Sequence, residues 1–344
     1  MEQKYINGKI TLNRACNLRC SWCYAKETQY RNEEFMSLHT VYDVIDIFSN
    51  LGLRRVSLIG GEPTLYPYLF EVIERIKQKN MRFGFISNGI AYKNIDFVKK
   101  LKCLGMDNFS ISLKGTSRKV FLDTTEKDCF YDVISGIENC LSVGATVVVF
   151  LVITHSNIDE IIGFVSNMRA LGVQKFHFSF LYNYDNTYGY KGYLEKNIPN
   201  TLVSRFEKIY PTLDKITNGK IKLFPTFPLC FFNADIVNEL INKKQLSMNC
   251  QIKDRNTLIF DEDGKVIPCS AMFDVSLGKL YYDFTSADEL INYMQHSKPQ
   301  KLYDRYNIFL TEKCAECEYN KHCTPCACQW TNYSFKQLIA TKSR

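Results

Sequence analysis

The chain lacks the segments that direct a protein into or across a membrane. Its first residues, Met1 to Lys9, contain no apolar core of a signal peptide. No uninterrupted apolar run among the 344 residues is long enough to span a bilayer. We therefore expect a cytoplasmic protein with no membrane partner.

Tracts of one charge sign, low-complexity segments and sequence repeats of 20–50 residues are also missing. The 43 basic and 36 acidic residues give a net charge of +7 and are dispersed along the chain. Nucleic-acid-binding proteins usually gather their basic residues into a patch, so we expect no nucleic-acid partner. With 46% hydrophobic and 23% charged residues, the composition is that of an ordinary globular protein.

Cysteine, in contrast, is abundant, with 14 residues. In a chain without an export signal, this abundance favours reduced thiols and metal ligation over disulfides. Cys16, Cys20 and Cys23 lie close together just after the apolar run Ile10–Leu12. One short loop of this kind can hold an iron–sulfur cluster through its thiolates, and three ligands leave one iron of a four-iron cluster free. The alternative is packing, because the three positions also share a helix face.

Short β-branched runs alternate with segments of helical periodicity between residues 10 and 217. The predicted strands are Ile10–Arg14, Arg55–Ile59, Arg82–Ser87, Asn108–Leu113, Thr146–Thr154 and Lys175–Leu181. The predicted helices are Leu38–Leu51, Tyr68–Lys79, Ile95–Leu104, Tyr131–Val143, Ile158–Leu171 and Leu202–Ile216. Six successive βα units predict an α/β fold with a parallel sheet, closed or partly closed into a barrel. The first cysteine loop follows the first strand, where such barrels carry their chemistry.

Local signals mark several helix boundaries. Ser37 and Asn157 are predicted N-caps, and four glycines stand where helices would end. These glycines are Gly52, Gly105, Gly144 and Gly172.

The composition changes near residue 220, where proline, cysteine and short strands become more frequent. The turn-forming sequence 261–264 lies between Leu258–Phe260 and Lys265–Ile267, which predicts a β-hairpin. We therefore expect a first domain over residues 1–220 and a second, smaller one over residues 221–344.

The cysteine loop resembles the signature of the radical S-adenosylmethionine (SAM) enzymes. The resemblance rests on the spacing of Cys16, Cys20 and Cys23, with aromatic Trp22 before the last cysteine and Tyr24 after it. It implies that a [4Fe–4S] cluster binds SAM through its free iron and cleaves SAM to a 5′-deoxyadenosyl radical. It further implies that Trp22 lies near the adenine and that the fold is a partial (β/α)6 barrel.

The sequence Gly60-Gly61-Glu62-Pro63 directly follows the second predicted strand. Two glycines allow a close approach of the backbone to a ligand, but the same residues also suit a tight strand-to-helix turn. The radical SAM enzymes carry this motif here, which implies that Gly60, Gly61 and Glu62 contact the SAM amino group.

Strand ends supply further candidate SAM contacts through the same resemblance. Ser87 and Asn88 are assigned to the ribose or methionine portion, and Ser112 is the candidate from the fourth strand. Arg118 is assigned to the SAM carboxylate, with an exposed surface arginine as the alternative interpretation. The chain departs from many relatives at Lys114, where they carry Asp.

Two features at later strand ends are candidates for substrate contacts. His155 follows the fifth strand and is a candidate for substrate binding or proton transfer, although a strand-end histidine is more often packed or solvated. The aromatic loop Tyr182–Tyr190 follows the sixth strand and is a candidate peptide-binding loop, with an ordered surface loop as the alternative.

A second set of cysteines lies in the C-terminal third. Cys250 is followed by Gly264 and Cys269, and the later members are Cys314, Cys317, Cys323, Cys326 and Cys328. The arrangement resembles the SPASM extension of peptide-modifying radical SAM enzymes, which holds up to two auxiliary [4Fe–4S] clusters. It departs from that pattern at Cys326 and Cys328.

The resemblance, with Cys230 added as an eighth thiol, implies two ligand sets. The first is Cys230, Cys250, Cys269 and either Cys326 or Cys328, and the second is Cys314, Cys317, Cys323 and the remaining one. Structural zinc is the competing interpretation, because paired Cys-x2-Cys motifs also suit tetrahedral zinc sites. The unmatched cysteines Cys103, Cys129 and Cys140 are predicted packing residues.

These resemblances imply a radical SAM enzyme that removes hydrogen from a peptide and forms a thioether or carbon-based crosslink in a ribosomally made peptide. The implied partners are a peptide substrate, a low-potential flavodoxin- or ferredoxin-type electron donor, and a separate leader-recognition protein, since the cluster loop begins at residue 16.

Three other functions stay open. Sulfatase maturation is one, but that branch carries an acidic residue after the cysteine matching Cys269, where this chain has Ser270. A small-molecule dehydrogenase or epimerase is the second. A non-catalytic iron–sulfur or zinc interaction module is the third.

Overall fold

The computed structural model describes residues 5–23, 35–180, 198–270, 272–273, 275–306 and 314–323. The chain forms two compact units that do not follow sequence order. The first comprises Met1–Asn17, Tyr24–Ser87 and Gln251–Ile308, and the second comprises Leu18–Cys23, Asn88–Cys250 and Phe309–Arg344. The division into domains at residue 220 stays a prediction.

The first unit contains a sheet whose parallel part has the order β8-β1-β2-β3. These strands are β1 (Asn7–Thr11), β2 (Arg55–Ile59), β3 (Arg82–Ser87) and β8 (Thr257–Phe260). The short strands β9 (Lys265–Val266) and β10 (Gly278–Lys279) continue the sheet in antiparallel pairing, β9 with β8 and β10 with β9. The predicted hairpin across residues 261–264 is therefore confirmed, and its first strand pairs along β1.

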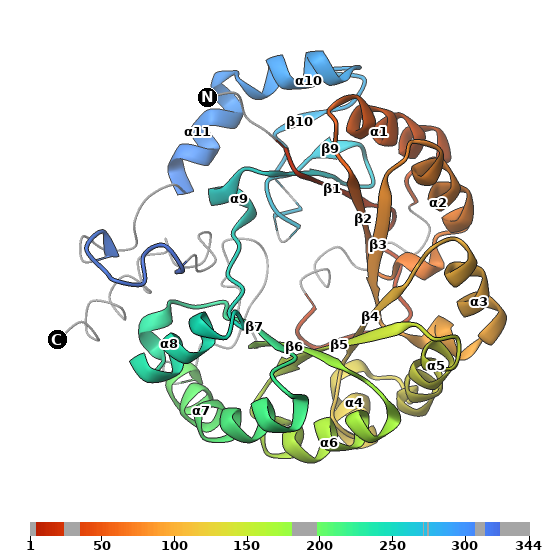
Figure 1. Ribbon diagram of the computed structural model, residues 1–344. Coiled ribbons are helices and arrows are strands. Elements are labelled where there is room, and N and C mark those ends of the chain that lie inside the picture. The colour runs from red at the N-terminus through yellow and green to blue at the C-terminus, as the bar shows by residue number, and fades with distance from the viewer. Residues whose placement is uncertain are drawn as a thin grey trace. The chain divides into compact units, whose positions relative to one another are not determined.

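The helices of this unit are α1 (Leu38–Asn50), α2 (Leu69–Gln78), α9 (Gln251–Asp254), α10 (Ala287–Met294) and α11 (Ser297–Tyr306). Figure 1 shows α1 and α2 side by side along β1–β3. Helix α1 buries Val41, Val44 and Phe48, which recur at helical spacing. The predicted cap Ser37 is confirmed, because its side chain accepts a hydrogen bond from the Thr40 N–H.

The second unit contains four parallel strands in the order β4-β5-β6-β7. They are β4 (Asn108–Leu113), β5 (Thr146–Ile153), β6 (Lys175–Phe180) and β7 (Ile221–Phe224). Strand side chains alternate between two faces. One face is fully buried and packs against the helices, as when Phe180 of β6 meets Phe206 at 5.4 Å between ring centroids.

The other face of β4–β7 is here named the lysine-bearing face. Its members include Ser110, Ser112, Lys114, Phe150, Val152, His177, Ser179, Lys222 and Phe224, all half-buried. Ser112, Phe150, His177 and Lys222 form one row across the four strands, because each is in register with the next.

The helices of the second unit are α3 (Ile95–Cys103), α4 (Arg118–Thr125), α5 (Phe130–Ser142), α6 (Ile161–Leu171), α7 (Ile198–Thr217) and α8 (Ala234–Asn242). Helices α4 and α8 were not predicted. Figure 1 shows α4, α5, α6 and α7 on one side of these strands. The predicted helix-ending glycines Gly52, Gly105, Gly144 and Gly172 all adopt positive φ, which an L side chain rarely does. With six βα repeats and parallel pairing, the predicted α/β class is confirmed.

One predicted cap is confirmed in position only, and one predicted packing residue is wrong. Asn157 stands at the N-cap of the 3-10 helix Ile158–Glu160 but makes no capping hydrogen bond, because its side chain instead binds the Val152 carbonyl and the Thr154 N–H at the end of β5. Cys140 is buried as predicted, but Cys103 is exposed at the end of α3.

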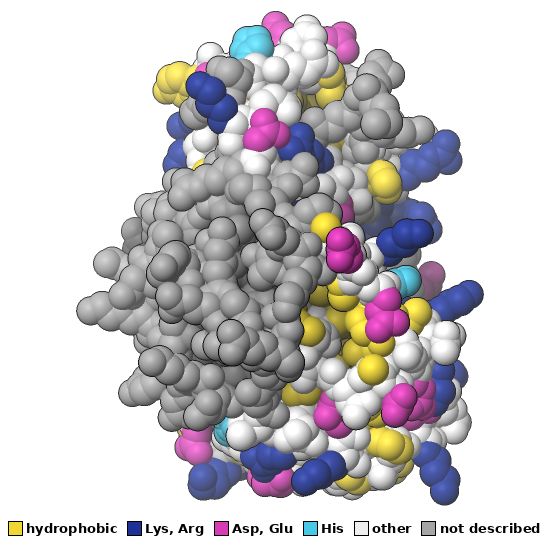
Figure 2. Space-filling view, turned by 90° about the vertical axis from the view of Figure 1, so that its left-hand side faces the viewer, with side chains coloured by type: hydrophobic (Ala, Val, Ile, Leu, Met, Phe, Trp, Pro, Cys, Tyr) yellow, Lys and Arg dark blue, Asp and Glu magenta, His cyan; other side chains and the backbone are white. Residues whose placement is uncertain are grey.

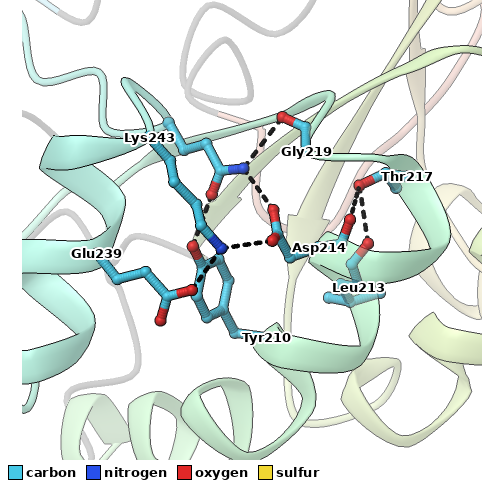
Figure 3. A network of polar contacts seen from close by, with 8 residues as sticks. Tyr210, Leu213, Asp214, Thr217, Gly219, Glu239 and Lys243 are labelled. Carbon is cyan, nitrogen blue, oxygen red and sulfur yellow. Dashed lines mark hydrogen bonds and ion pairs between the residues drawn. The ribbon is translucent and has the colours of Figure 1, made fainter.

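A polar network fastens α7 to α8 and to the start of β7 (Figure 3). Gln245 accepts a hydrogen bond from the Tyr210 hydroxyl at 2.7 Å and donates to Asp214 and to the Gly219 carbonyl. Lys243 lies between Asp214 and Glu239, with its ammonium 2.6 and 2.5 Å from their carboxylate oxygens. Every polar group of the buried Gln245 amide thus has a partner, which fixes the turn that leads into β7.

On the face shown in Figure 2, the described basic and acidic side chains are interspersed, as the sequence predicts. None of the described helices combines the length and the apolar character that crossing a membrane requires.

Candidate functional site

The start of the cysteine loop lies against the Gly60-Gly61-Glu62 turn in the first unit. The Gly61 N–H donates to the Asn13 carbonyl at 3.0 Å, and the Glu62 N–H donates to the Ala15 carbonyl at 2.7 Å. In return, the Asn13 side-chain amide donates to the Glu62 carbonyl at 3.2 Å. The backbone that leads into Cys16 is therefore hydrogen-bonded to the turn after β2.

The two glycines are needed because this contact is close. A Cβ atom on Gly61 would lie 2.3 Å from the Ala15 carbonyl oxygen and 2.4 Å from that of Arg14. A Cβ on Gly60 would lie 2.7 Å from the Asn13 carbonyl oxygen. All three distances are well inside van der Waals contact, so the glycines allow two stretches of backbone to touch. The sequence predicted close approach to a ligand, and the structure adds close approach to the loop.

Glu62 is almost completely buried and anchored through one oxygen. Its Oε1 accepts hydrogen bonds from the Thr64 N–H and hydroxyl, at 3.2 and 2.7 Å, and from the Ser87 hydroxyl at 2.8 Å. Ser87, at the end of β3, therefore orients Glu62. Contacts of Ser87, Gly60, Gly61 and Glu62 with SAM stay predictions.

A buried ion pair, which the sequence did not predict, lies at the base of the loop. Arg14 Nε is 2.7 Å from Glu262 Oε1, and both side chains are at most 5% exposed. The Arg14 guanidinium also lies 5.5 Å from the ring centroid of Phe273. Next to Glu262, burial raises the pKa of Asp261 to about 6, although the Lys265 N–H opposes the shift. The only sequence signal was the turn motif of residues 261–264, which shows the hairpin but not its partner on β1.

The second half of the cysteine loop is held by α4 in the second unit. The Arg19 N–H donates to the Thr125 carbonyl at 3.0 Å, and the Ser21 N–H donates to the Thr124 carbonyl at 2.8 Å. Carbonyls in the last turn of a helix have no partner within the helix, so they are available to the loop. Within the loop, the Cys23 N–H donates to the Cys20 carbonyl at 3.0 Å.

Cys20, Trp22 and Lys114 lie together in this unit. Burial raises the pKa of the Cys20 thiol, and the nearby positive charge of Lys114 opposes that shift. The Lys114 ammonium lies 5.1 Å from the ring centroid of Trp22 and donates to the Ser112 hydroxyl at 2.6 Å. Metal binding replaces the thiol proton, so a buried cysteine of raised pKa is still a suitable iron ligand.

Other predicted site residues have partners or positions of their own. Arg118 is on the surface and binds both oxygens of Asp128. Asn88 accepts a hydrogen bond from the Ile90 N–H at 3.1 Å, which forms the turn after β3. His155 is exposed just beyond β5. Roles of these three residues toward SAM or substrate stay predictions, and Tyr182–Tyr190 lie outside the described residues.

His177 was missed by the sequence analysis. It lies in the middle of β6 on the lysine-bearing face, with its ring 4.5 Å from Phe150 and 5.3 Å from Phe224. Burial, with help from Lys222 and Lys175, lowers the pKa of His177 to about 4. The imidazole is therefore neutral at pH 7.

Four of the C-terminal cysteines are associated in the second unit. Cys323 Sγ accepts a hydrogen bond from the Leu229 N–H at 3.5 Å, next to Cys230. Burial is the main cause that raises the pKa of Cys323 to about 11; Cys230, Cys314 and Cys317 contribute to the rise, and the Leu229 N–H opposes it. The predicted grouping of Cys230 with Cys250 and Cys269 stays a prediction. Cys326 and Cys328 lie outside the described residues.

None of the cysteines in the described ranges forms a disulfide, as expected for reduced metal ligands. In the same ranges, no three Cys, His, Asp or Glu side chains converge tightly enough to hold a single metal ion. A cubane cluster is bound differently, because each thiolate binds its own iron corner. The donor chemistry fits thiolate-ligated clusters.

Comparison with known proteins identifies the N-terminal half. Residues 10–167 match the model of the Radical SAM superfamily. The chain is 33% identical over 171 residues to a probable GTP 3′,8-cyclase of Saccharolobus islandicus (strain M.14.25 / Kamchatka #1), covering 49% of this chain and 54% of that protein. A probable GTP 3′,8-cyclase of Pyrococcus abyssi is 31% identical over 169 residues, covering 48% and 54%. The chain thus spans about half the length of these curated relatives.

Similarity of fold extends over nearly the whole chain. Streptococcus suis SuiB bound to S-adenosylmethionine superposes with a TM-score of 0.70 at 17% identity, covering 97% of this chain and 76% of SuiB. The enzyme anSMEcpe with bound AdoMet and Cp18Cys peptide gives 0.68 at 16% identity, covering 98% and 99%. At such identities the likeness concerns the fold alone. Within this shared fold, residues 10–167 are the part whose sequence matches the Radical SAM superfamily model.

Proposed function

We propose that the protein reductively cleaves SAM and uses the resulting radical to remove hydrogen from a peptide, with a thioether or carbon-based crosslink as the product. The observation that carries the SAM-cleaving part is the way the cysteine loop is held. Its start is bonded to Gly61 and Glu62, and its second half is bonded to the last turn of α4. Each anchor fixes the backbone beside the thiols of its own unit, Cys16 in the first unit and Cys20 and Cys23 in the second, and ordered backbone of this kind supports cluster ligation.

The residues that would hold the cluster are Cys16, Cys20 and Cys23. When bound, the cluster supplies one electron to SAM, whose cleavage yields a 5′-deoxyadenosyl radical for hydrogen abstraction. The protein's own residues bind and orient: Gly60, Gly61 and Glu62 toward the SAM amino group, and a wider set toward the remainder of SAM. That set is Trp22, Ser87, Asn88, Ser112 and Arg118.

Buried anchoring supports this division of roles. Glu62 is held by Thr64 and Ser87 through Oε1, so its carboxylate cannot swing away from the loop. The Trp22 indole, next in sequence to Cys23, is held face-on to Lys114 and offers a planar surface beside the loop.

Support for a peptide substrate comes from the fold neighbours. One SuiB structure is bound to precursor peptide SuiA, and it superposes on 93% of this chain with a TM-score of 0.68. The anSMEcpe structure contains the Cp18Cys peptide. Both likenesses extend over the C-terminal region, where Cys230, Cys314, Cys317 and Cys323 are associated. We propose that the C-terminal cysteines hold two auxiliary [4Fe–4S] clusters, which accept the second electron of a net oxidation.

A nucleotide substrate is the second candidate. It is favoured by the 33% identity to probable GTP 3′,8-cyclases, which is higher than the identity to either fold neighbour. That identity is confined to about half of the chain and leaves the C-terminal cysteines unexplained. We propose a flavodoxin- or ferredoxin-type protein as the electron donor and the cytoplasm as the location. For a peptide substrate, we also propose a separate protein that recognises its leader.

SAM cleavage tests the core of the proposal. The anaerobically reconstituted chain is reduced with dithionite in the presence of SAM, and 5′-deoxyadenosine is measured. Cys16→Ala, Cys20→Ala and Cys23→Ala should each abolish its formation, whereas Cys103→Ala, at an exposed cysteine of α3, should not. A wild-type chain that forms no 5′-deoxyadenosine would contradict the proposal.

Iron content and substrate choice test the rest. Three four-iron clusters predict about twelve irons per chain, and a value near four with tightly bound zinc would replace the auxiliary clusters by a structural zinc site. The substrate class is determined in two parallel reactions, one supplied with GTP and the other with a peptide that is encoded beside the gene. Deuterium transfer from substrate to 5′-deoxyadenosine identifies which of them reacts.

A further inference from the structure

The lysine-bearing face of the second unit has an unusual charge balance. Strands β4–β7 contain no Asp or Glu, while Lys175 and Lys222 lie within them and Lys114 directly follows β4. The Lys222 ammonium donates to the Lys244 carbonyl, and it forms no ion pair with a carboxylate within the described ranges of the chain. With His177 uncharged at pH 7, the fixed charges on this face are positive.

Lys114 is the lysine of this face that lies beside the cysteine loop. Its ammonium donates to the Ser112 hydroxyl at 2.6 Å and lies 5.1 Å from the centroid of the Trp22 ring. Ser112 is two residues earlier on the same face, which directs the lysine along the strand end. Ser112 and Trp22 are uncharged, and the third group near Lys114 is the buried Cys20 thiol. Trp22 is next in sequence to Cys23.

No acidic side chain in the described part of the chain forms an ion pair with Lys114, although other lysines of the second unit, such as Lys93 and Lys102, form them. Glu160 accepts a hydrogen bond from Thr116, two residues beyond Lys114, at 2.5 Å. A half-buried ammonium loses part of its hydration, and a hydroxyl with an aromatic ring restores only part of that free energy. An anionic ligand would complete the set.

We propose that Lys114, with Ser112, forms a binding position for an anionic oxygen group, a carboxylate or phosphate, of the molecule that reacts beside the cysteine loop. This inference rests on the proposed function, because it assumes that a reaction takes place beside the cysteine loop. Anion binding itself can be measured without turnover. Two molecules can supply this anionic group, the substrate and SAM through its carboxylate, and the titrations below distinguish them. Replacement of Lys114 by the Asp of many relatives would reverse the charge that the position accepts.

Trp22 provides the readout, because it touches Lys114. The chain has two tryptophans, so a Trp330→Phe background leaves Trp22 as the single fluorophore. Holoprotein in this background is titrated with inorganic phosphate and with glutarate, against chloride at equal ionic strength. It is also titrated with S-adenosylhomocysteine, which carries the amino-acid carboxylate, and with 5′-methylthioadenosine, which lacks it.

The variants are Lys114→Gln, Lys114→Arg and the control Lys119→Gln, an exposed lysine paired with Asp123 on α4. We expect Lys114→Gln to weaken phosphate and glutarate binding at least five-fold, Lys114→Arg to restore most of it, and Lys119→Gln to leave it unchanged. Unchanged affinity for S-adenosylhomocysteine in Lys114→Gln assigns the anion to the substrate. A selective loss for S-adenosylhomocysteine, with 5′-methylthioadenosine unaffected, assigns it to SAM. Equal anion affinity in wild type and Lys114→Gln, or equal losses in Lys119→Gln, would overturn the inference.

The two proposals fail separately. If wild type forms 5′-deoxyadenosine but Lys114→Gln binds anions as wild type does, only the anion position is lost. If wild type forms no 5′-deoxyadenosine, the fluorescence titrations still decide whether Lys114 binds anions.

Discussion

Replacing Gly61 by Ala should displace the start of the cysteine loop. The new Cβ would lie 2.3 Å from the Ala15 carbonyl oxygen and 2.4 Å from that of Arg14, and both contacts are backbone. Neither backbone can rotate away like a side chain, so we expect the two segments to separate by roughly 1 Å, the overlap relative to an ordinary carbon–oxygen contact.

Two hydrogen bonds would lengthen as a result. They join Gly61 N–H to the Asn13 carbonyl and Glu62 N–H to the Ala15 carbonyl, at 3.0 and 2.7 Å. Weakening each costs about 0.5–1.5 kcal/mol, and strain from overpacking adds about 1–3 kcal/mol. We therefore expect Gly61→Ala to lower the free energy of unfolding by about 2–4 kcal/mol and to move Cys16, which follows Ala15.

The assay combines urea unfolding with iron analysis of the reconstituted chain. A displaced Cys16 should remove one four-iron cluster, lowering the iron content from about twelve to about eight per chain, and 5′-deoxyadenosine formation should fall with it. The matched control is Gly163→Ala in α6, where a Cβ meets nothing within 4 Å and alanine should stabilise the helix by about 0.5–1 kcal/mol.

The reasoning is refuted if Gly61→Ala resembles Gly163→Ala in unfolding midpoint, iron content and SAM cleavage. If Gly61→Ala does not accumulate as folded protein, Gly60→Ala provides a milder test, because its Cβ would meet the Asn13 carbonyl oxygen at 2.7 Å. Its losses should be smaller but of the same kind.

Two further predictions concern ionisable groups. His177 has a folded pKa of about 4, below the usual 6.5, so its contribution to stability is present above pH 6.5 and is lost as the pH falls toward 4. The shift corresponds to about 3 kcal/mol at most. Because the ring is half-buried, we expect the free energy of unfolding of His177→Phe to fall by about 1–2 kcal/mol less than that of wild type on acidification. Parallel profiles of unfolding free energy against pH for wild type and variant would contradict this. Glu262→Gln should lower the free energy of unfolding by about 2–3 kcal/mol, because it leaves the buried Arg14 without its ion-pair partner. The neighbouring exposed change Asp263→Asn should have an effect near zero, and similar urea midpoints for the two variants would argue against the ion pair.

The sequence alone determined the features that depend on near neighbours in the chain. Strands β2, β3 and β4 have the bounds that the β-branched runs predict, and the helix ends at Gly52 and Gly144 follow from the preference of glycine for positive φ. The motifs around Cys16–Cys23 and Gly60–Glu62 led to the radical SAM superfamily, which residues 10–167 match.

Tertiary structure alone decided what those motifs contact. Helix α4 was missed because its eight residues, Arg118–Thr125, give too short a pattern to separate from a loop, yet its last carbonyls hold Arg19 and Ser21. The ion pair of Arg14 with Glu262 joins residues far apart in sequence, and it depends on the parallel register of β1 with β8. His177 looked like one residue of an apolar strand until strand pairing placed it between Phe150 and Lys222. Periodicity and spacing are local properties of a chain, whereas burial and pairing of charges are set by which distant segments the fold brings together.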